Sequence, residues 1–337
     1  MTATLPLVAL VALALAFSLL NGYRDSSNIV ATMISSRAFP PTVALAVTAL
    51  AEFAGPFIFG VAVAKTIGND LVAPGAVNLA VIVAALATAC VWGVFTWALH
   101  VPSSSSHALI GGLVGAAVAG AGWQAIQGGG LLKVLAALVV APVIGLTVGF
   151  LLTRLVFYLS LGASPRINGF FKRSQLVTAV ALAFSHGTND GQKSMGIITL
   201  GLVTAGRLSS FAVPLWVILA CSSMLALGTA LGDWGLIKTV GGKFYQMRPV
   251  DGFSAQLTSA VVILSASLVG GPVSTSQVVS SAIVGAGSAQ RLSRVRWGVA
   301  GDILVTWLLT IPATALVAAA IYWAALHGLP ILGRLTP

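Results

Sequence analysis

Two aspartates, Asp25 and Asp190, have the surroundings best suited to chemistry. Each lies in a polar stretch within an otherwise apolar segment, NGYRDSSN at 21–28 and HGTNDGQK at 186–193. Glycines in both stretches let the backbone leave helical geometry. A broken helix exposes N–H groups at one end and C=O groups at the other, and these ends bind anions and cations respectively. We therefore expect two broken helices whose aspartates hold Na⁺ or H⁺. A kink stabilised by a buried ion pair, such as Asp25 with Arg24, is the alternative.

A second pair of stretches, PSSSSH (102–107) and PVSTSQ (272–277), places hydroxyls behind a proline. Proline suits the first helical turn, where its missing N–H costs nothing. Hydroxyls and free amides at a helix N-terminus suit a tetrahedral oxyanion. We expect such a site to use Ser103, Ser104, Ser105, Ser106, Ser274, Thr275 and Ser276. Helix capping with small-residue packing explains one such stretch better, but the occurrence of two favours the anion site.

Four further side chains are candidates because they are polar within apolar runs. Glu52 lies midway along such a run, where a charge costs several kcal/mol unless it faces the protein interior or water. His107 and His186 can donate to an anion or relay protons, and each can equally be a packing residue. Lys193 follows Asp190 by three residues, so on a helix it can pair with that aspartate or attract an anion.

The composition is that of a membrane protein. Of 337 residues, 58% are hydrophobic and 7% charged, with a mean hydropathy of +1.01. A soluble surface needs far more charge than this. We expect an all-α polytopic membrane protein with about ten transmembrane segments. The net charge of +10 is explained by basic cytoplasmic loops, without a nucleic-acid partner. No ATP-binding loop, hydrolase motif or Cys/His metal cluster is present, so we expect neither an enzyme nor a bound cofactor.

The apolar segments fall into two groups of five. They lie at 4–20 with 27–38, 41–64, 77–99, 104–121 and 130–158, and at 176–186 with 191–205, 209–232, 252–270, 272–288 and 295–326. The two polar stretches around the aspartates align at an offset of 165 residues, and the two hydroxyl stretches at 170. We expect a duplication, with a first membrane repeat at 1–160, a basic cytoplasmic linker at 161–175 and a second repeat at 176–330.

Because five crossings per repeat is an odd number, the two repeats should be inverted across the membrane. Basic clusters at 166–173, 238–248 and 291–296 are separated by two segments each, so all three fall on one side. The positive-inside rule makes that side cytoplasmic and places both termini outside.

At these residues the chain resembles the inorganic phosphate transporter (PiT) family, over nearly its whole length. NGYRDSSNIVAT and SHGTNDGQKSMGI match its two GANDVANA-type motifs, and PSSSSHA and PVSTSQV its PVSTTHA-type motifs. FSHGTNDGQKSMG is similar to the bacterial low-affinity branch. The resemblance implies a plasma-membrane symporter of inorganic phosphate, working by alternating access and dimeric.

The resemblance also assigns residues. It implies that Asp25, Asn28, Asp190 and the hydroxyls of 103–106 and 274–276 build the substrate and ion sites, and Asn189 matches the asparagine of the motif. From the residues themselves we add Lys193 to the substrate site, and Glu52 and His107 to Asp25 and Asp190 at the coupling-ion site. Asp25 and Asp190 would be the metal ligands if that ion is Na⁺. Lys193 is similar to the proton-coupled bacterial members, and a lysine repels a nearby Na⁺, so H⁺ coupling is favoured. Such members take up phosphate as a neutral metal–phosphate complex. Arg24 departs from the motif, and its role stays open. A sulfate permease of the same family and an uncoupled anion channel are the alternatives.

Overall fold

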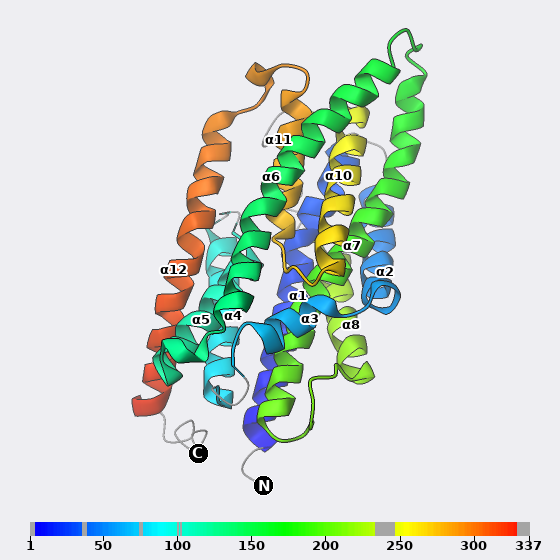
Figure 1. The fold of residues 1–337 in the computed structure, drawn as a ribbon. Coiled ribbons are helices and arrows are strands. Elements are labelled where there is room, and N and C mark those ends of the chain that lie inside the picture. Colours follow the sequence, from blue (N-terminus) through cyan, green and yellow to red (C-terminus); the bar gives the residue numbers. More distant parts are fainter. Residues whose placement is uncertain are drawn as a thin grey trace.

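The computed structural model describes residues 4–35, 39–73, 77–99, 101, 103–232 and 247–328. Within them the chain forms ten longer helices, most lying roughly side by side, with α1 beginning and α12 ending at the same end of the bundle (Figure 1). The longer helices are α1 (Thr4–Ser35), α2 (Pro41–Phe59), α4 (Leu79–Ala98), α5 (Ser105–Ala121), α6 (Gly128–Leu159), α7 (Ile167–Thr204), α8 (Leu215–Leu231), α10 (Pro249–Leu268), α11 (Thr275–Ser288) and α12 (Trp297–Gly328). The short α3 (Ala62–Lys65) and the π-helical turn Thr66–Asp70 follow α2.

The all-helical expectation is confirmed for the described residues, and each predicted segment contains one longer helix. Six helices are long and apolar enough to cross a membrane: Leu5–Val30, Pro41–Phe59, Leu79–Ala98, Gly128–Leu159, Pro249–Leu268 and Leu304–His327. The count of ten crossings and their inversion stay predictions. Two boundaries differ from those predicted. The segment at 41–64 is divided between α2 and α3, and α7 begins at Ile167, so part of the basic interval is helical. Pro102, Lys238 and Lys243 lie outside the described residues.

The predicted helix breaks at Asp25 and Asp190 are wrong, because α1 and α7 run through both stretches without interruption. The glycines serve close packing instead. A Cβ on Gly22 would lie 2.0 Å from Leu225 O in α8, and one on Gly187 would lie 2.1 Å from Glu52 O in α2. The helix also absorbs polar side chains, since Ser26 Oγ donates to its own helix at Tyr23 O.

The chain is interrupted instead at the hydroxyl stretches, which join α4 to α5 and α10 to α11. Pro272 precedes the first helical residue, Thr275, by three positions, so the expectation of a proline in the first turn is wrong there. The N-terminal ends of α5 and α11 meet. Ser106 Oγ donates to Val273 O at 2.8 Å. These two helix starts therefore turn their positive dipole ends toward the middle of the bundle.

Helices at equivalent places in the two halves of the chain pack in equivalent pairs. α5 packs on α4 and α12, and α11 packs on α10 and α6. Likewise α1 packs on α8, and α7 packs on α2. Figure 1 shows α5 in the lower part of the bundle and α11 in the upper part. This arrangement places α1, α2 and α7 around a shared centre.

Candidate functional site

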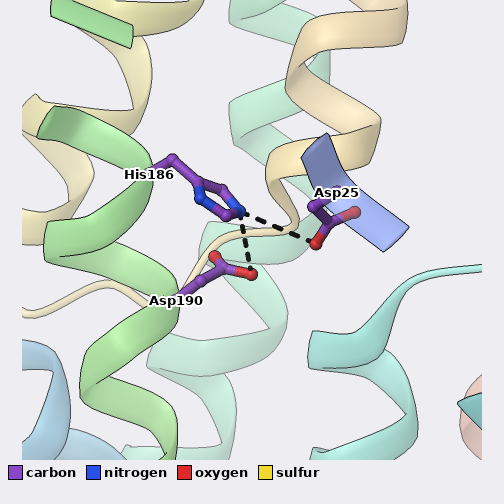
Figure 2. Close-up of side chains that lie close together, drawn as sticks. All are labelled: Asp25, His186 and Asp190. Atoms are coloured by element: carbon purple, nitrogen blue, oxygen red, sulfur yellow. Dashed lines mark ion pairs between the residues drawn. The ribbon is translucent and has the colours of Figure 1, made fainter. Parts of the chain in front are cut away.

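A buried cluster of acidic and histidine side chains lies where α1, α2 and α7 meet (Figure 2). His186 Nε2 lies 3.7 Å from Asp25 Oδ2 and 3.6 Å from Asp190 Oδ2. His186 Nδ1 lies 2.9 Å from Glu52 Oε1. The four residues are at most 5% exposed. Side chains from positions 25, 52, 186 and 190 thus form one site.

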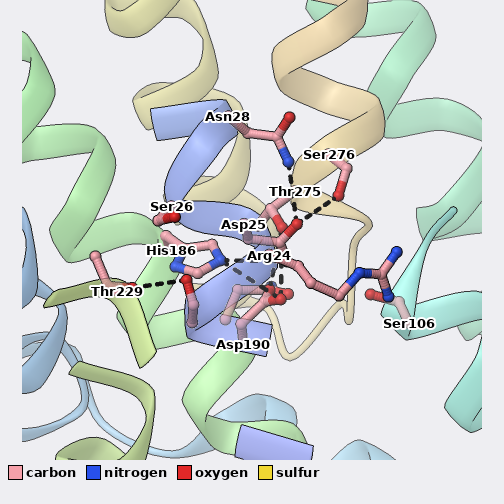
Figure 3. Close-up of polar contacts among 12 residues, drawn as sticks. Arg24, Asp25, Ser26, Asn28, Ser106, His186, Asp190, Thr229, Thr275 and Ser276 are labelled. Atoms are coloured by element: carbon pink, nitrogen blue, oxygen red, sulfur yellow. Dashed lines mark hydrogen bonds and ion pairs between the residues drawn. The ribbon is translucent and has the colours of Figure 1, made fainter. Parts of the chain in front are cut away.

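The other oxygen of each carboxylate in this cluster is held by the protein (Figure 3). Asp25 Oδ1 accepts from Ser276 Oγ at 2.9 Å and from Asn28 Nδ2 at 3.0 Å. Glu52 Oε2 accepts from Thr229 Oγ1 at 2.6 Å. These bonds orient the carboxylates and leave Asp25 Oδ2 facing the imidazole.

Lys193 links the cluster to the start of α5. Its Nζ donates to Asp190 Oδ1 at 2.7 Å and to Ser106 Oγ at 2.6 Å, and its side chain is fully buried. Thr275 Oγ1, at the start of α11, lies 3.4 Å from both oxygens of Asp190. The predicted pairing of Lys193 with Asp190 is present, and the ammonium is a fixed positive charge in the cluster.

A pocket opens beside the cluster, and Asp25 belongs to both. Its polar lining includes a guanidinium, hydroxyls and an amide, contributed by Arg24, Ser27, Asn28, Thr96, Ser103, Ser276 and Ser280. Arg24 Nη2 donates to Thr96 Oγ1 at 3.2 Å and to Ser103 O at 3.3 Å. The guanidinium is therefore directed toward the start of α5. Positive charge with neutral donors suits an oxyanion.

The hydroxyl side chains of the two stretches have different contacts. Ser103 and Ser276 line the pocket, whereas Ser104 caps α5 by accepting from His107 N at 3.2 Å. Ser105 is buried at the first residue of α5. Ser274 Oγ is buried at the start of α11 without a hydrogen-bond partner. The two starts thus keep donors near the pocket while other hydroxyls stabilise the helices.

Two further predicted site residues, His107 and Asn189, have hydrogen bonds to neither the cluster nor the pocket lining among the described residues. His107 Nδ1 lies 2.8 Å from Ser104 Oγ, and its Nε2 lies 3.3 Å from Gln277 Nε2. Asn189 Nδ2 donates to Ser267 Oγ at 2.8 Å, and its Oδ1 accepts from Val273 N at 3.3 Å. The structure thus gives His107 and Asn189 contacts that hold the helix starts. Their predicted functional roles stay predictions.

Some site residues were hard to recognise from the sequence. For His186 a packing role was as well supported as a functional one, yet its side chain lies at the centre of the cluster. Its position as the first residue of the polar stretch at 186–193 was the available signal. Thr96 and Thr229 gave none, because single threonines are common in apolar helices, and only their contacts with Arg24 and Glu52 single them out.

Comparison of the sequence with known proteins identifies the family of this chain. The sequence profile of the phosphate transporter family matches residues 21–168 and 158–318. The chain belongs to the phosphate transporter family. It is 43% identical over 321 residues to a protein of Rhizobium meliloti (strain 1021) named "Probable low-affinity inorganic phosphate transporter", covering 95% of this chain and 96% of that one. A protein of Bacillus subtilis (strain 168) with the same name is 42% identical, with coverage of 94% and 96%.

A solved structure supports the fold. "The sodium-dependent phosphate transporter" superposes with a TM-score of 0.86 over 95% of this chain and 99% of that one, at 23% identity. As a member of the phosphate transporter family with several apolar helices, the chain is a multi-pass membrane protein of the plasma membrane. The relatives are transporters, in agreement with the expectation that it is not an enzyme.

Proposed function

We propose that this chain imports inorganic phosphate, free or as a metal–phosphate complex, by symport with a cation and by alternating access of its two halves. One observation carries the proposal. The donor-lined pocket holding Arg24 shares Asp25 with a buried cluster of three carboxylates and a histidine. An anion site and a cation site that share a side chain are the arrangement that obligatory co-transport needs, because occupation of one then changes the free energy of the other.

Phosphate binds in this pocket between Arg24 and the two helix starts. The guanidinium offers paired donors, and Ser103 and Ser276 offer hydroxyls from opposite halves of the chain. The N-terminal ends of α5 and α11 add a positive dipole field. Movement of one half against the other would separate these donors, and the separation would release the anion.

The coupling cation binds at Asp25, His186 and Asp190. Within the cluster three carboxylates face one fixed ammonium, that of Lys193. Uncompensated charge buried in a membrane protein is costly, so an additional cation stabilises this centre. We favour H⁺, because the Lys193 ammonium already occupies Asp190 Oδ1 and repels Na⁺ there. The homodimer is part of the proposal that comes from the family resemblance, and the inverted topology is part that comes from the five segments in each half and the positions of the basic clusters.

Phosphate is favoured over sulfate because Asp25 lines the pocket. At neutral pH phosphate can donate a hydrogen bond to a carboxylate, and sulfate cannot. An uncoupled channel would leave the paired buried carboxylates without a role.

Uptake of labelled phosphate into proteoliposomes tests the proposal. An inward proton gradient should drive accumulation above the external concentration, with excess sulfate having little effect. Asp25→Asn should abolish driven uptake. Equilibration without accumulation under both H⁺ and Na⁺ gradients would show a channel, and equal inhibition by sulfate would remove the preference for phosphate.

A further inference from the structure

The inward-facing atoms of the central cluster have the composition of a transition-metal site. Asp25, His186 and Asp190 each offer one ligand atom, and these atoms lie within 4.8 Å of one another (Figure 2). One imidazole with two carboxylates suits first-row divalent ions such as Mn²⁺, Co²⁺ and Zn²⁺, whereas Na⁺ and Mg²⁺ prefer oxygen ligands.

The spacing fits an ion better than direct bonds between the side chains. His186 Nε2 lies 3.7 Å from Asp25 Oδ2 and 3.6 Å from Asp190 Oδ2, and this nitrogen is buried without a hydrogen-bond partner. Ligands about 2.1 Å from a tetrahedral ion lie about 3.4 Å apart. The imidazole nitrogen is therefore too far away to bond either carboxylate well, and near the separation that a shared ion imposes.

The surroundings of the cluster fix all three ligands. Glu52 Oε1 lies 2.9 Å from His186 Nδ1, and Glu52 is itself held by Thr229. A carboxylate on the far nitrogen sets the tautomer that presents Nε2 to a metal. Ser276 and Asn28 hold Asp25 through Oδ1, as Lys193 holds Asp190 through Oδ1. The three ligand atoms that remain lie within 4.8 Å of one another.

Charge permits a divalent occupant. With a neutral imidazole, Asp25, Glu52 and Asp190 carry three negative charges against the positive charges of Lys193 and of Arg24, which lines the neighbouring pocket together with Asp25. A divalent cation therefore leaves the centre within one charge of neutrality. The Lys193 ammonium repels any cation here, and the His186 nitrogen offsets that repulsion for a transition metal but not for Na⁺. Because the ligands bind metal only when deprotonated, H⁺ and the metal ion are alternative occupants of this centre.

We propose that Asp25, His186 and Asp190 bind one divalent transition-metal ion in a roughly tetrahedral site, with Glu52 as the positioning residue. The inference rests on the proposed function only in that the same centre carries the coupling cation. Asp25 also lines the pocket that holds Arg24, so a fourth, oxygen ligand, such as water or a phosphate oxygen, would reach the ion from that side.

Metal binding by the purified full-length protein in detergent tests this directly, without phosphate or any gradient. Calorimetry with Co²⁺ or Mn²⁺ should show one saturable site, and Co²⁺ should give the strong visible absorption of tetrahedral coordination. Pulsed EPR of the Mn²⁺ form of the unmodified protein should show coupling to a histidine nitrogen. Absence of that nitrogen coupling, or no saturable binding, would overturn the proposal whatever any variant does.

Variants locate the site. His186→Gln and Asp25→Asn should each abolish binding, and Glu52→Gln should weaken it by about 10- to 100-fold. His327→Gln is the matched control, because His327 is exposed and stacks on Trp323 in α12. Binding lost in H327Q and kept in H186Q would show an adventitious surface site. Since these measurements need no transport, a failure of phosphate symport leaves the metal result standing, and the reverse also holds.

Discussion

Lys193 stands in α7 where Asn28 stands in α1. Each follows an aspartate by three residues and donates to its Oδ1, Lys193 Nζ to Asp190 at 2.7 Å and Asn28 Nδ2 to Asp25 at 3.0 Å. The partner hydroxyls match as well, because Ser276 contacts Asp25 and Ser106 contacts Lys193. The two halves thus build similar arrangements, in which an ammonium in α7 stands where an amide stands in α1.

Replacing that ammonium should create a second cation site. In Lys193→Asn an uncompensated Asp190 would face a neutral amide, as Asp25 does, and Na⁺ should stimulate phosphate uptake that is insensitive to Na⁺ in the unmodified protein. Uptake measured against external Na⁺ concentration checks this. Lys193→Arg keeps the charge and should show no Na⁺ stimulation. If Lys193→Asn transports phosphate with no response to Na⁺, then Lys193 does not set the choice of ion.

Arg24 should determine phosphate affinity. A hydrogen bond to a charged group contributes about 1.5–3 kcal/mol, so Arg24→Gln should raise the KM for phosphate by about tenfold to a hundredfold. Arg24→Lys keeps the charge but loses the paired donors, so its KM for phosphate should lie between those of the unmodified protein and of Arg24→Gln. Arg207→Gln removes an exposed arginine and is the control. An unchanged KM in Arg24→Gln would exclude the guanidinium from the phosphate site.

Gly187 should be intolerant of a side chain. Its Cβ would lie 2.1 Å from Glu52 O, so Gly187→Ala must push α2 away from α7 and move Glu52 from His186. Overpacking of this kind costs about 1–3 kcal/mol and should lower the unfolding temperature in detergent. In the same helix, a Cβ on the exposed Gly169 would meet nothing within 4 Å. Gly169→Ala should therefore be neutral or stabilising by up to about 1 kcal/mol. Equal stability of the two variants would contradict the close packing.

Asn189 should matter for stability more than for substrate choice. Asn189→Ala removes the acceptor of the Val273 N–H and the donor to Ser267 Oγ, and a buried unsatisfied group costs about 1–3 kcal/mol. Thermal unfolding should show the loss, while the preference for phosphate over sulfate should persist. Asn168→Ala, at an exposed position of the same helix, is the control. Normal stability with a changed anion preference would instead support the substrate-binding role that the resemblance implies.

Much of the fold was predictable because apolar runs of bilayer length and polar residues within them are strong signals. The segment around Glu52 and the paired aspartates were found in this way. The continuity of the helices at Asp25 and Asp190 could not be predicted in this way, because glycine permits either a bend or a close contact. Only the backbone of the neighbouring helix, such as Glu52 O beside Gly187, decides between the two.

The presence of a polar site could be predicted from the sequence more easily than the residues that form it. The equivalence of the hydroxyl stretches was visible in the sequence, but the division among pocket lining, capping and ion pairing depends on which side chain meets which helix. Ser106, for instance, meets Lys193 rather than the pocket. His186 lies at the centre because α2 brings Glu52 to its far nitrogen, a contact across 134 positions that no local pattern encodes.

Simultaneous measurement of phosphate and proton entry into proteoliposomes tests the central claim most directly. With labelled phosphate outside and a pH-sensitive dye inside, we expect proton entry to rise in constant proportion to phosphate entry. Both should be lost in Asp25→Asn. Accumulation of phosphate without proton entry, or with proton entry that does not scale with it, would contradict proton-coupled symport through the centre formed by Asp25, His186 and Asp190.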